Sequence, residues 1–136
     1  MIHVFINGRL AKKQDIIIAS ELLLNEQCPD CNSIVDVNIE ILKTVDENLA
    51  GYCWGDSEHV EIELARVSND YTYTRQELLL NLTHELVHAK QLINKQFEFK
   101  LQEELIKNTP YNKLPWEQEA YGLEDSLYEE YFKRLT

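Results

Sequence analysis

The stretch that decides the fold is "TRQELLLNLTHELVHAKQLIN", which runs from Thr74 to Asn94. Thr74 and Glu77 stand three residues apart, which is the spacing of a capping box at the start of a helix. Four apolar residues then recur at helical spacing: Leu79, Leu82, Leu86 and Ile93. The stretch therefore predicts a long helix from about Arg75 to about Asn94, whose apolar stripe packs against a sheet.

Segments with strand periodicity precede this helix. Residues 50–55, "AGYCWG", and residues 59–67, "HVEIELARV", each predict a short strand. The turn-like Gly-Asp-Ser between them predicts that the two strands form an antiparallel hairpin. Residues 34–42, "IVDVNIEIL", alternate apolar and polar side chains and predict another strand. Before them, residues 14–27, "QDIIIASELLLNEQ", predict a first helix that ends at the turn-like "CPDCNS".

Two further segments follow the long helix. Residues 97–107, "FEFKLQEELIK", are amphipathic, and Pro115 suits the first position of a last helix that ends near Arg134. The apolar stripe of that helix would be Trp116, Ala120, Leu123, Leu127 and Tyr131. The whole pattern predicts an α+β fold, in which a mainly antiparallel sheet of three strands, or four, packs on an N-terminal helix, the long helix and a C-terminal helix. Nothing marks a domain boundary, so we expect one domain over residues 1–136.

The composition excludes some classes of partner. The formal charge of −11 comes from 24 acidic and 13 basic residues, with the acids spread along the chain, so nucleic acid is not an expected partner. No window approaches the ~18 consecutive apolar residues of a membrane span, so we expect no membrane partner. Three cysteines, an odd number, fit a reducing compartment better than a disulfide framework, and we expect a cytoplasmic protein.

The long helix carries the motif that indicates chemistry. His84 and His88 lie four residues apart, so their imidazoles project from one helix face and can hold one metal ion. Glu85 can then reach a water on that ion and take its proton, which is why His-Glu-x-x-His on a helix is typical of zinc hydrolases. The alternative is an accidental match on an ordinary amphipathic helix of a structural domain that binds no metal.

Around this motif, "LTHELVHAKQ" resembles the active-site helix of the zincin metallopeptidases. The metzincin branch continues with Gly and a third His, but Gln91 and Asn94 stand at the corresponding positions. SprT-like proteins also take a third His downstream, and no histidine follows His88 in this sequence. The remaining resemblance is to the gluzincins, in which a second helix supplies a glutamate ligand.

The resemblance to gluzincins assigns the third ligand to the last helix. "PWEQEAYG" offers Glu117 with the small Ala120 three residues later, which is similar to the Glu-x-x-Ala pattern of that group. Glu119 is a rival, because helical geometry places both carboxylates at similar angles on opposite flanks of the apolar stripe. The family pattern favours Glu117.

Two supporting roles stay open. Gluzincins commonly place an Asp four residues after the ligand Glu to orient a ligand histidine, whereas this chain has Tyr121, and Glu124 or Asp125 could substitute. Peptide hydrolysis also needs a donor for the oxyanion, for which Tyr111, Tyr121 and Tyr128 are all candidates.

The resemblance implies a small zinc-dependent peptidase that acts on a peptide or protein substrate. Zn²⁺ would be bound by His84, His88 and Glu117, with Glu85 as general base. Residues 59–67 would be either the edge strand along which zincins bind an extended peptide or a plain sheet strand. A second hypothesis keeps the zincin fold and the metal, but makes the chain a catalytically silent binding or regulatory module.

Cysteines give a weaker signal. Cys28 and Cys31, in "CPDC", could be half of a zinc site or a redox pair. A four-thiolate site needs a second pair, and Cys53 is the only other cysteine, so a turn with two reduced thiols is the favoured interpretation. His3 and His59 are interpreted as plain polar residues.

Overall fold

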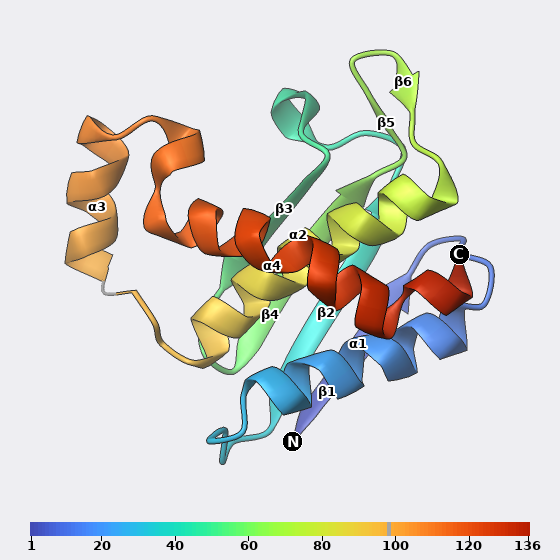
Figure 1. Cartoon of the computed structure of the whole chain (residues 1–136), viewed down its shortest axis with the longest axis horizontal. Helices are drawn as coiled ribbons and strands as arrows, with labels where there is room; N and C mark the ends of the chain where they lie inside the picture. The colour runs from blue at the N-terminus through green and yellow to red at the C-terminus, as the bar shows by residue number, and fades with distance from the viewer. Residues whose placement is uncertain (98) are drawn as a thin grey trace.

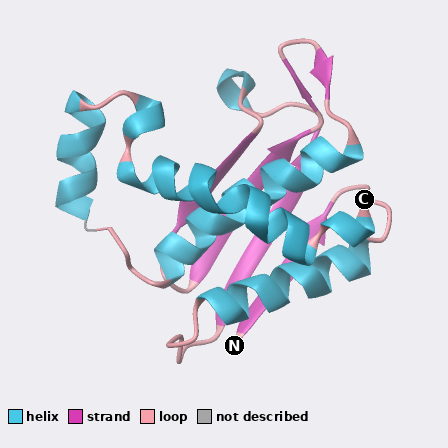
Figure 2. Cartoon of the chain, viewed as in Figure 1, coloured by secondary structure: helices cyan, strands magenta, loops and turns pink. Residues whose placement is uncertain are grey.

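One mixed sheet of four strands forms the base of the molecule (Figure 2). The structure is a computed structural model, and it describes residues 1–97 and 99–136. The strands lie in the order β1 (Ile2–Asn7), β2 (Val35–Leu42), β4 (His59–Ala65) and β3 (Gly51–Gly55). β1 and β4 each run parallel to β2, whereas β3 runs antiparallel to its neighbour β4.

This topology confirms the α+β class and corrects the sheet. The expected hairpin is formed by β3 and β4, and the sheet has a fourth strand, β1, which no sequence segment was assigned to. The expectation of a mainly antiparallel sheet is wrong, because three of the four strands are parallel to one another. Of the two alternatives for residues 59–67, the plain sheet strand is the correct one, since β4 lies inside the sheet and β3 forms the edge.

The placement of the helices explains why the alternation of apolar and polar residues wrongly predicted an antiparallel sheet. Parallel sheets usually carry helices on both faces and read as continuous apolar runs, whereas alternation is typical of an antiparallel sheet with one wet face. Here the described helices pack on one face, so the parallel strands alternate too (Figure 1). In β2, Val37 and Ile39 are buried while Glu40 is exposed; in β1, Val4 is buried and Phe5 is exposed.

Two helices cover this inner face, and a third packs on them (Figure 1). α1 (Lys13–Gln27) lies against β1, α2 (Arg75–Ile93) lies against β3 and β4, and α4 (Pro115–Tyr131) packs on α2 and touches α1. α1 and α2 match the expected segments closely, while α4 ends a few residues early and is followed by η3 (Lys133–Leu135). Among the described residues, no helix is both long and apolar enough to cross a membrane.

The remaining elements are short connections. The amphipathic stretch of residues 97–107 corresponds to α3 (Phe99–Asn108), although Glu98 lies outside the described residues. The other elements are η1 (Asp46–Asn48), β5 (Val67–Ser68), β6 (Tyr71–Thr72) and η2 (Tyr111–Lys113).

One cluster of buried side chains joins the layers. The expected stripe of α2 is buried in full: Leu79, Leu82, Leu86 and Ile93. Ala120 of α4 is 0% exposed, and this small side chain lets α4 lie close to α2. The packing therefore brings polar residues of α2 and α4 face to face beside the edge strand β3.

Candidate metal centre

Local sequence fixes where α2 starts and hence which face carries the histidines. Thr74 and Glu77 form the expected capping box: the Thr74 hydroxyl accepts from the Glu77 amide at 3.1 Å, and the Glu77 carboxylate accepts from the Thr74 amide at 2.9 Å. With the leucine stripe turned toward the sheet, His84 and His88 lie together on the flank that meets α4. Their ring centroids are 4.9 Å apart.

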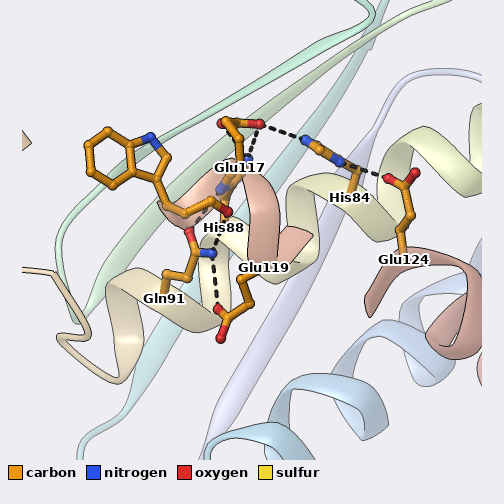
Figure 3. A network of polar contacts seen from close by, with 7 residues as sticks. His84, His88, Gln91, Glu117, Glu119 and Glu124 are labelled. Carbon is orange, nitrogen blue, oxygen red and sulfur yellow. Dashed lines mark hydrogen bonds and ion pairs between the residues drawn. The ribbon is translucent and has the colours of Figure 1, made fainter. Parts of the chain in front are cut away.

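The two histidines meet one carboxylate from α4 (Figure 3). Nε2 of His84 lies 3.1 Å from Oε1 of Glu117, and Nε2 of His88 lies 3.0 Å from Oε2 of the same residue. One ligand atom from each of the three residues lies within 4.8 Å of the others, so together they form a group that could hold a metal ion. Glu117 is buried and both histidines are partly buried, which strengthens their interaction with a cation.

The other ring nitrogen of each histidine, Nδ1, has a hydrogen-bond partner of its own (Figure 3). Nδ1 of His84 lies 2.7 Å from Oε2 of Glu124, and Nδ1 of His88 lies 2.8 Å from Oε1 of Gln91. An oxygen acceptor at Nδ1 favours a proton on that nitrogen, so Nε2 is the nitrogen whose lone pair becomes available to a cation once it releases its own proton. This is the outer support that ligand histidines need to keep their rings in one orientation.

Sequence reasoning found one of these two supports. Glu124 was one of two candidates for orienting a histidine, and the other, Asp125, is exposed. In the sequence, Gln91 stands out only as the residue at the position of the metzincin glycine. Its position three residues after His88 on one helix is the spacing at which side chains touch, and that signal could have identified it.

Glu119 points away from Glu117, to the other side of the same helix (Figure 3). Its carboxylate pairs with Lys90 at 3.2 Å and accepts a hydrogen bond from Nε2 of Gln91 at 3.0 Å. Because the Gln91 amide orients His88, Glu119 supports the site from outside and does not belong to the three-residue group.

Glu85 lies beside that group and against the edge strand. It is 6% exposed, and a Cβ atom at Gly51 of β3 would lie 3.1 Å from both its Cγ and its Oε2, so any larger residue would press on the Glu85 side chain. Burial raises the pKa of Glu85 to about 7, although His88 and His84 act to lower it. A carboxylate with a pKa in this range is suited to take up and release a proton near neutral pH.

The charges of the group favour a cation. Burial acts to lower the pKa of His84, but the hydrogen bond to Glu117 and the nearby carboxylates outweigh it and raise the pKa to about 9. Burial acts to raise the pKa of Glu117, but the two histidines outweigh it and lower the pKa to about 2. The group therefore binds positive charge favourably. Protons and a metal ion can both supply this charge, so they compete for the same site.

A cleft follows β3 past these residues. A hollow of about 360 Å³ has Cys53 of β3 and Trp116 of α4 in its walls, and another of about 240 Å³ includes Leu80 from the first half of α2. Glu85 and Tyr111 border both hollows. The two hollows could thus accommodate side chains of a bound peptide on either side of Glu85.

The three tyrosine candidates take different places. Tyr111 borders both hollows, and burial and a nearby glutamate raise the pKa of its hydroxyl. The Tyr121 ring lies 4.9 Å from the His84 ring, centroid to centroid, and borders the smaller hollow. The Tyr128 hydroxyl hydrogen-bonds with Thr136 at 2.6 Å, and its residue is buried in the core cluster. Tyr128 is therefore not placed to reach the cleft.

The cysteines lie apart from this group. Cys28 at the end of α1, Cys31 and Cys53 are all free thiols. Within residues 1–97 and 99–136, the three-residue group of α2 and α4 is the one set of side chains spaced to hold a metal, and it contains no cysteine.

No protein-family model matches this chain, and no curated protein matches it either. The resemblance to zincins therefore rests on the motif of α2 and on its geometry with α4.

Proposed function

We propose that the protein is a zinc-dependent peptidase of the gluzincin type, in which His84, His88 and Glu117 bind the ion and Glu85 is the general base. One observation carries the proposal: each histidine directs Nε2 toward Glu117 while an acceptor of its own holds Nδ1. Surface histidines on an ordinary amphipathic helix have no need of such support at both nitrogens.

The donor set and its spacing suit zinc. Two imidazoles and one carboxylate leave a fourth position open, which is typical of catalytic zinc sites, whereas structural sites are closed by four protein ligands. A tetrahedral ion ~2.0–2.1 Å from each donor separates the donors by about 3.3 Å. Oε1 of Glu117 lies 3.1 Å from Nε2 of His84 and 3.2 Å from Nε2 of His88, close to that value.

When bound, zinc would supply a Lewis acid that lowers the pKa of its water to about 7 and polarises the carbonyl of the substrate. Glu85 takes the proton of the attacking water and passes it to the leaving amine, a double role that its pKa of about 7 supports. We assign Tyr111 as the hydrogen-bond donor to the developing oxyanion, because this tyrosine, like Glu85, borders both hollows.

The proposed substrate is an extended peptide that lies along β3. This strand is an edge of the sheet, so its outer main-chain groups are free to pair with such a segment.

Zinc analysis and one further variant test the proposal. The parent protein, purified without chelator, is expected to hold about one zinc per chain. His88→Ala is expected to lose the zinc and Glu117→Ala to bind it weakly, whereas Glu119→Ala, which acts only through Gln91, is expected to keep most of it. Asp125→Ala, which removes an exposed carboxylate of the same helix, is the matched control and is expected to keep the zinc in full. Glu85→Gln is expected to keep zinc and to lose cleavage of a peptide library prepared from a whole proteome.

Each part of the proposal can fail separately. A parent protein that takes up no zinc, even when it is added back, refutes the metal site. A zinc-loaded parent that cleaves nothing, or a Glu85→Gln variant that cleaves as well as the parent, refutes the peptidase. Zinc binding without cleavage would instead make the chain a regulatory or binding module that uses the same ligands.

A further inference from the structure

The sheet has a second face, which the described helices leave uncovered (Figure 1). We define the open face as the side chains of β1–β4 that point away from α1 and α2, and the following six carry the argument: Phe5, Glu40, Tyr52, Trp54, Glu61 and Glu63. Phe5, Tyr52 and Trp54 are 53%, 50% and 40% exposed. Sheets with parallel strands usually carry cover on both faces, so an open face with large aromatic side chains indicates that something binds there.

The charge of the open face is of one sign. The four strands β1–β4 contain no Lys or Arg, and none of Glu40, Glu61 and Glu63 forms an ion pair within the described part of the chain. In the register of the sheet, Glu40 of β2 stands directly beside Glu63 of β4. Like charges in this position repel each other, and a cation bound between them would remove the repulsion.

Aromatic rings stand next to these carboxylates in a repeated arrangement. Across the β3–β4 pair, Tyr52 is the register partner of Glu63, and Trp54 is the register partner of Glu61. The two rings stack at a tilt, with centroids 5.4 Å apart. Each pair thus offers a ring face for a cation–π contact and a carboxylate for an ion pair, which together are the contacts that an arginine or lysine side chain makes.

A hollow at the end of this face extends the same chemistry. It has a volume of about 450 Å³, with Val45 and Leu49 in its walls together with Tyr52. Asp46 and Glu47 of η1 add two more carboxylates. Apolar walls with a carboxylate rim fit the aliphatic stem and the charged head of a long basic side chain.

We propose that the open face binds a basic segment of a partner protein, whose arginine or lysine side chains lie on Tyr52 and Trp54 and pair with Glu63 and Glu61. The two ring–carboxylate pairs are two residues apart along the strands, which is ~6.8 Å. Basic residues at alternate positions of an extended segment have the same spacing. This inference goes beyond the proposed peptidase and does not depend on zinc, because none of the groups that bind the basic side chains is a metal ligand.

Binding of a defined peptide tests the proposal. The probe is a fluorescent peptide of alternating Arg and Thr, about nine residues long so that it can span a strand, and the measurement is fluorescence anisotropy at low salt. Glu61→Gln with Glu63→Gln is expected to weaken binding by about tenfold or more, and Trp54→Leu by about threefold to tenfold. The matched control is Glu103→Gln with Glu104→Gln, which removes the same charge from exposed positions on α3 and is expected to change the affinity less than about twofold.

The outcomes separate the open face from the net charge of the protein. Equal weakening by the two double variants would mean that the peptide follows the overall charge of −11, and it would overturn the proposal. Absence of binding at low salt, or binding that Trp54→Leu leaves unchanged, would overturn it as well. Sedimentation of the free protein as a dimer that Trp54→Leu dissociates would make the occupant a second copy of the chain and also refute a basic partner. Circular dichroism of each variant excludes loss of fold as the cause of weaker binding.

Discussion

The contact between Glu124 and His84 gives the sharpest test of how the site works. Oε2 of Glu124 lies 2.7 Å from Nδ1 of His84, a length typical of a charge-assisted hydrogen bond. Glu124→Gln keeps the size of the side chain but replaces the charged acceptor with a neutral amide. Loss of an outer partner of a ligand histidine costs about 10–100-fold in metal affinity, or about 1.4–2.7 kcal/mol.

The same loss predicts a change in thermal stability. At a fixed excess of free zinc, binding stabilises the folded state by RT ln(1 + [Zn]/Kd), so a 10–100-fold weaker site loses about 1.4–2.7 kcal/mol of that stabilisation. For 136 residues the entropy of unfolding is about 0.3 kcal/mol/K, so the Tm of the zinc-loaded protein should fall by about 5–9 °C. The Tm of the chelator-treated protein should fall less than that of the zinc-loaded protein, because it loses the hydrogen bond but no zinc binding.

Competition with a chromogenic chelator measures the zinc Kd, and differential scanning calorimetry measures both Tm values. Asp125→Asn is the matched control, because it removes one carboxylate from the exposed neighbouring position. A Glu124→Gln variant with the zinc affinity of the parent would refute the orienting role of Glu124. Equal loss of Tm with and without zinc would mean that Glu124 serves the packing of α4 and not the metal.

Three other substitutions probe the edge strand, the helix start and the α2–α4 contact. Gly51→Ala places a Cβ 3.1 Å from Cγ of Glu85, so kcat/KM should fall by about 10–100-fold while the zinc content is unchanged. Full activity in a peptide-cleavage assay would contradict the idea that Gly51 keeps Glu85 in position. Hydrogen bonds from the Thr74 amide and the Tyr71 hydroxyl lower the pKa of Glu77, so Glu77 stabilises the fold above its ordinary value of 4.5 and loses this effect as pH falls through its folded pKa. The difference in Tm between the parent and Glu77→Gln should therefore shrink from about pH 6 to about pH 3, and a constant difference would contradict this reasoning. Ala120→Leu adds volume at a fully buried position and should cost about 1–3 kcal/mol in urea unfolding together with weaker zinc binding; an unchanged zinc Kd would show that the separation of α2 and α4 does not set the site.

Features set by local sequence could be predicted, and α2 shows why. Its capping box involves residues three apart, and its stripe of leucines repeats with the period of the helix itself, so both its start and its buried face follow from one short segment. The choice between Glu117 and Glu119 was different, because their helical positions are nearly equivalent. In the structure, Glu119 forms an ion pair with Lys90, whereas Glu117 faces the histidines. This contact between α4 and α2 cannot be predicted from the sequence of either helix alone.

The β3–β4 hairpin was predicted correctly, but pairing between strands that are distant in the sequence depends on the whole chain and was not. The alternation of β2 and β4 shows that one face of each is buried, but alternation does not say whether two strands run parallel. β3 takes the outer edge and returns by a short turn, so the next strand, β4, enters the sheet between β3 and β2 and runs parallel to β2. β1 has the alternating pattern of a strand but was not assigned one, and its pairing with β2 follows only after α1 has crossed the sheet.

The geometry of α4 links metal binding to the docking of that helix. Glu117, which faces both histidines, and Glu124, which orients His84, are seven residues apart on α4 and so lie on the same face, two turns apart. Docking of α4 on α2 therefore brings both carboxylates close to a third, Glu85, and this concentration of negative charge is costly unless protons or a cation compensate for it. A divalent ion between the two helices would offset that cost better than protons on two histidines, since it interacts with all three carboxylates at once. Zinc binding and stable docking of α4 should accordingly be a single coupled event, in which the ion contributes to the fold as well as to the chemistry.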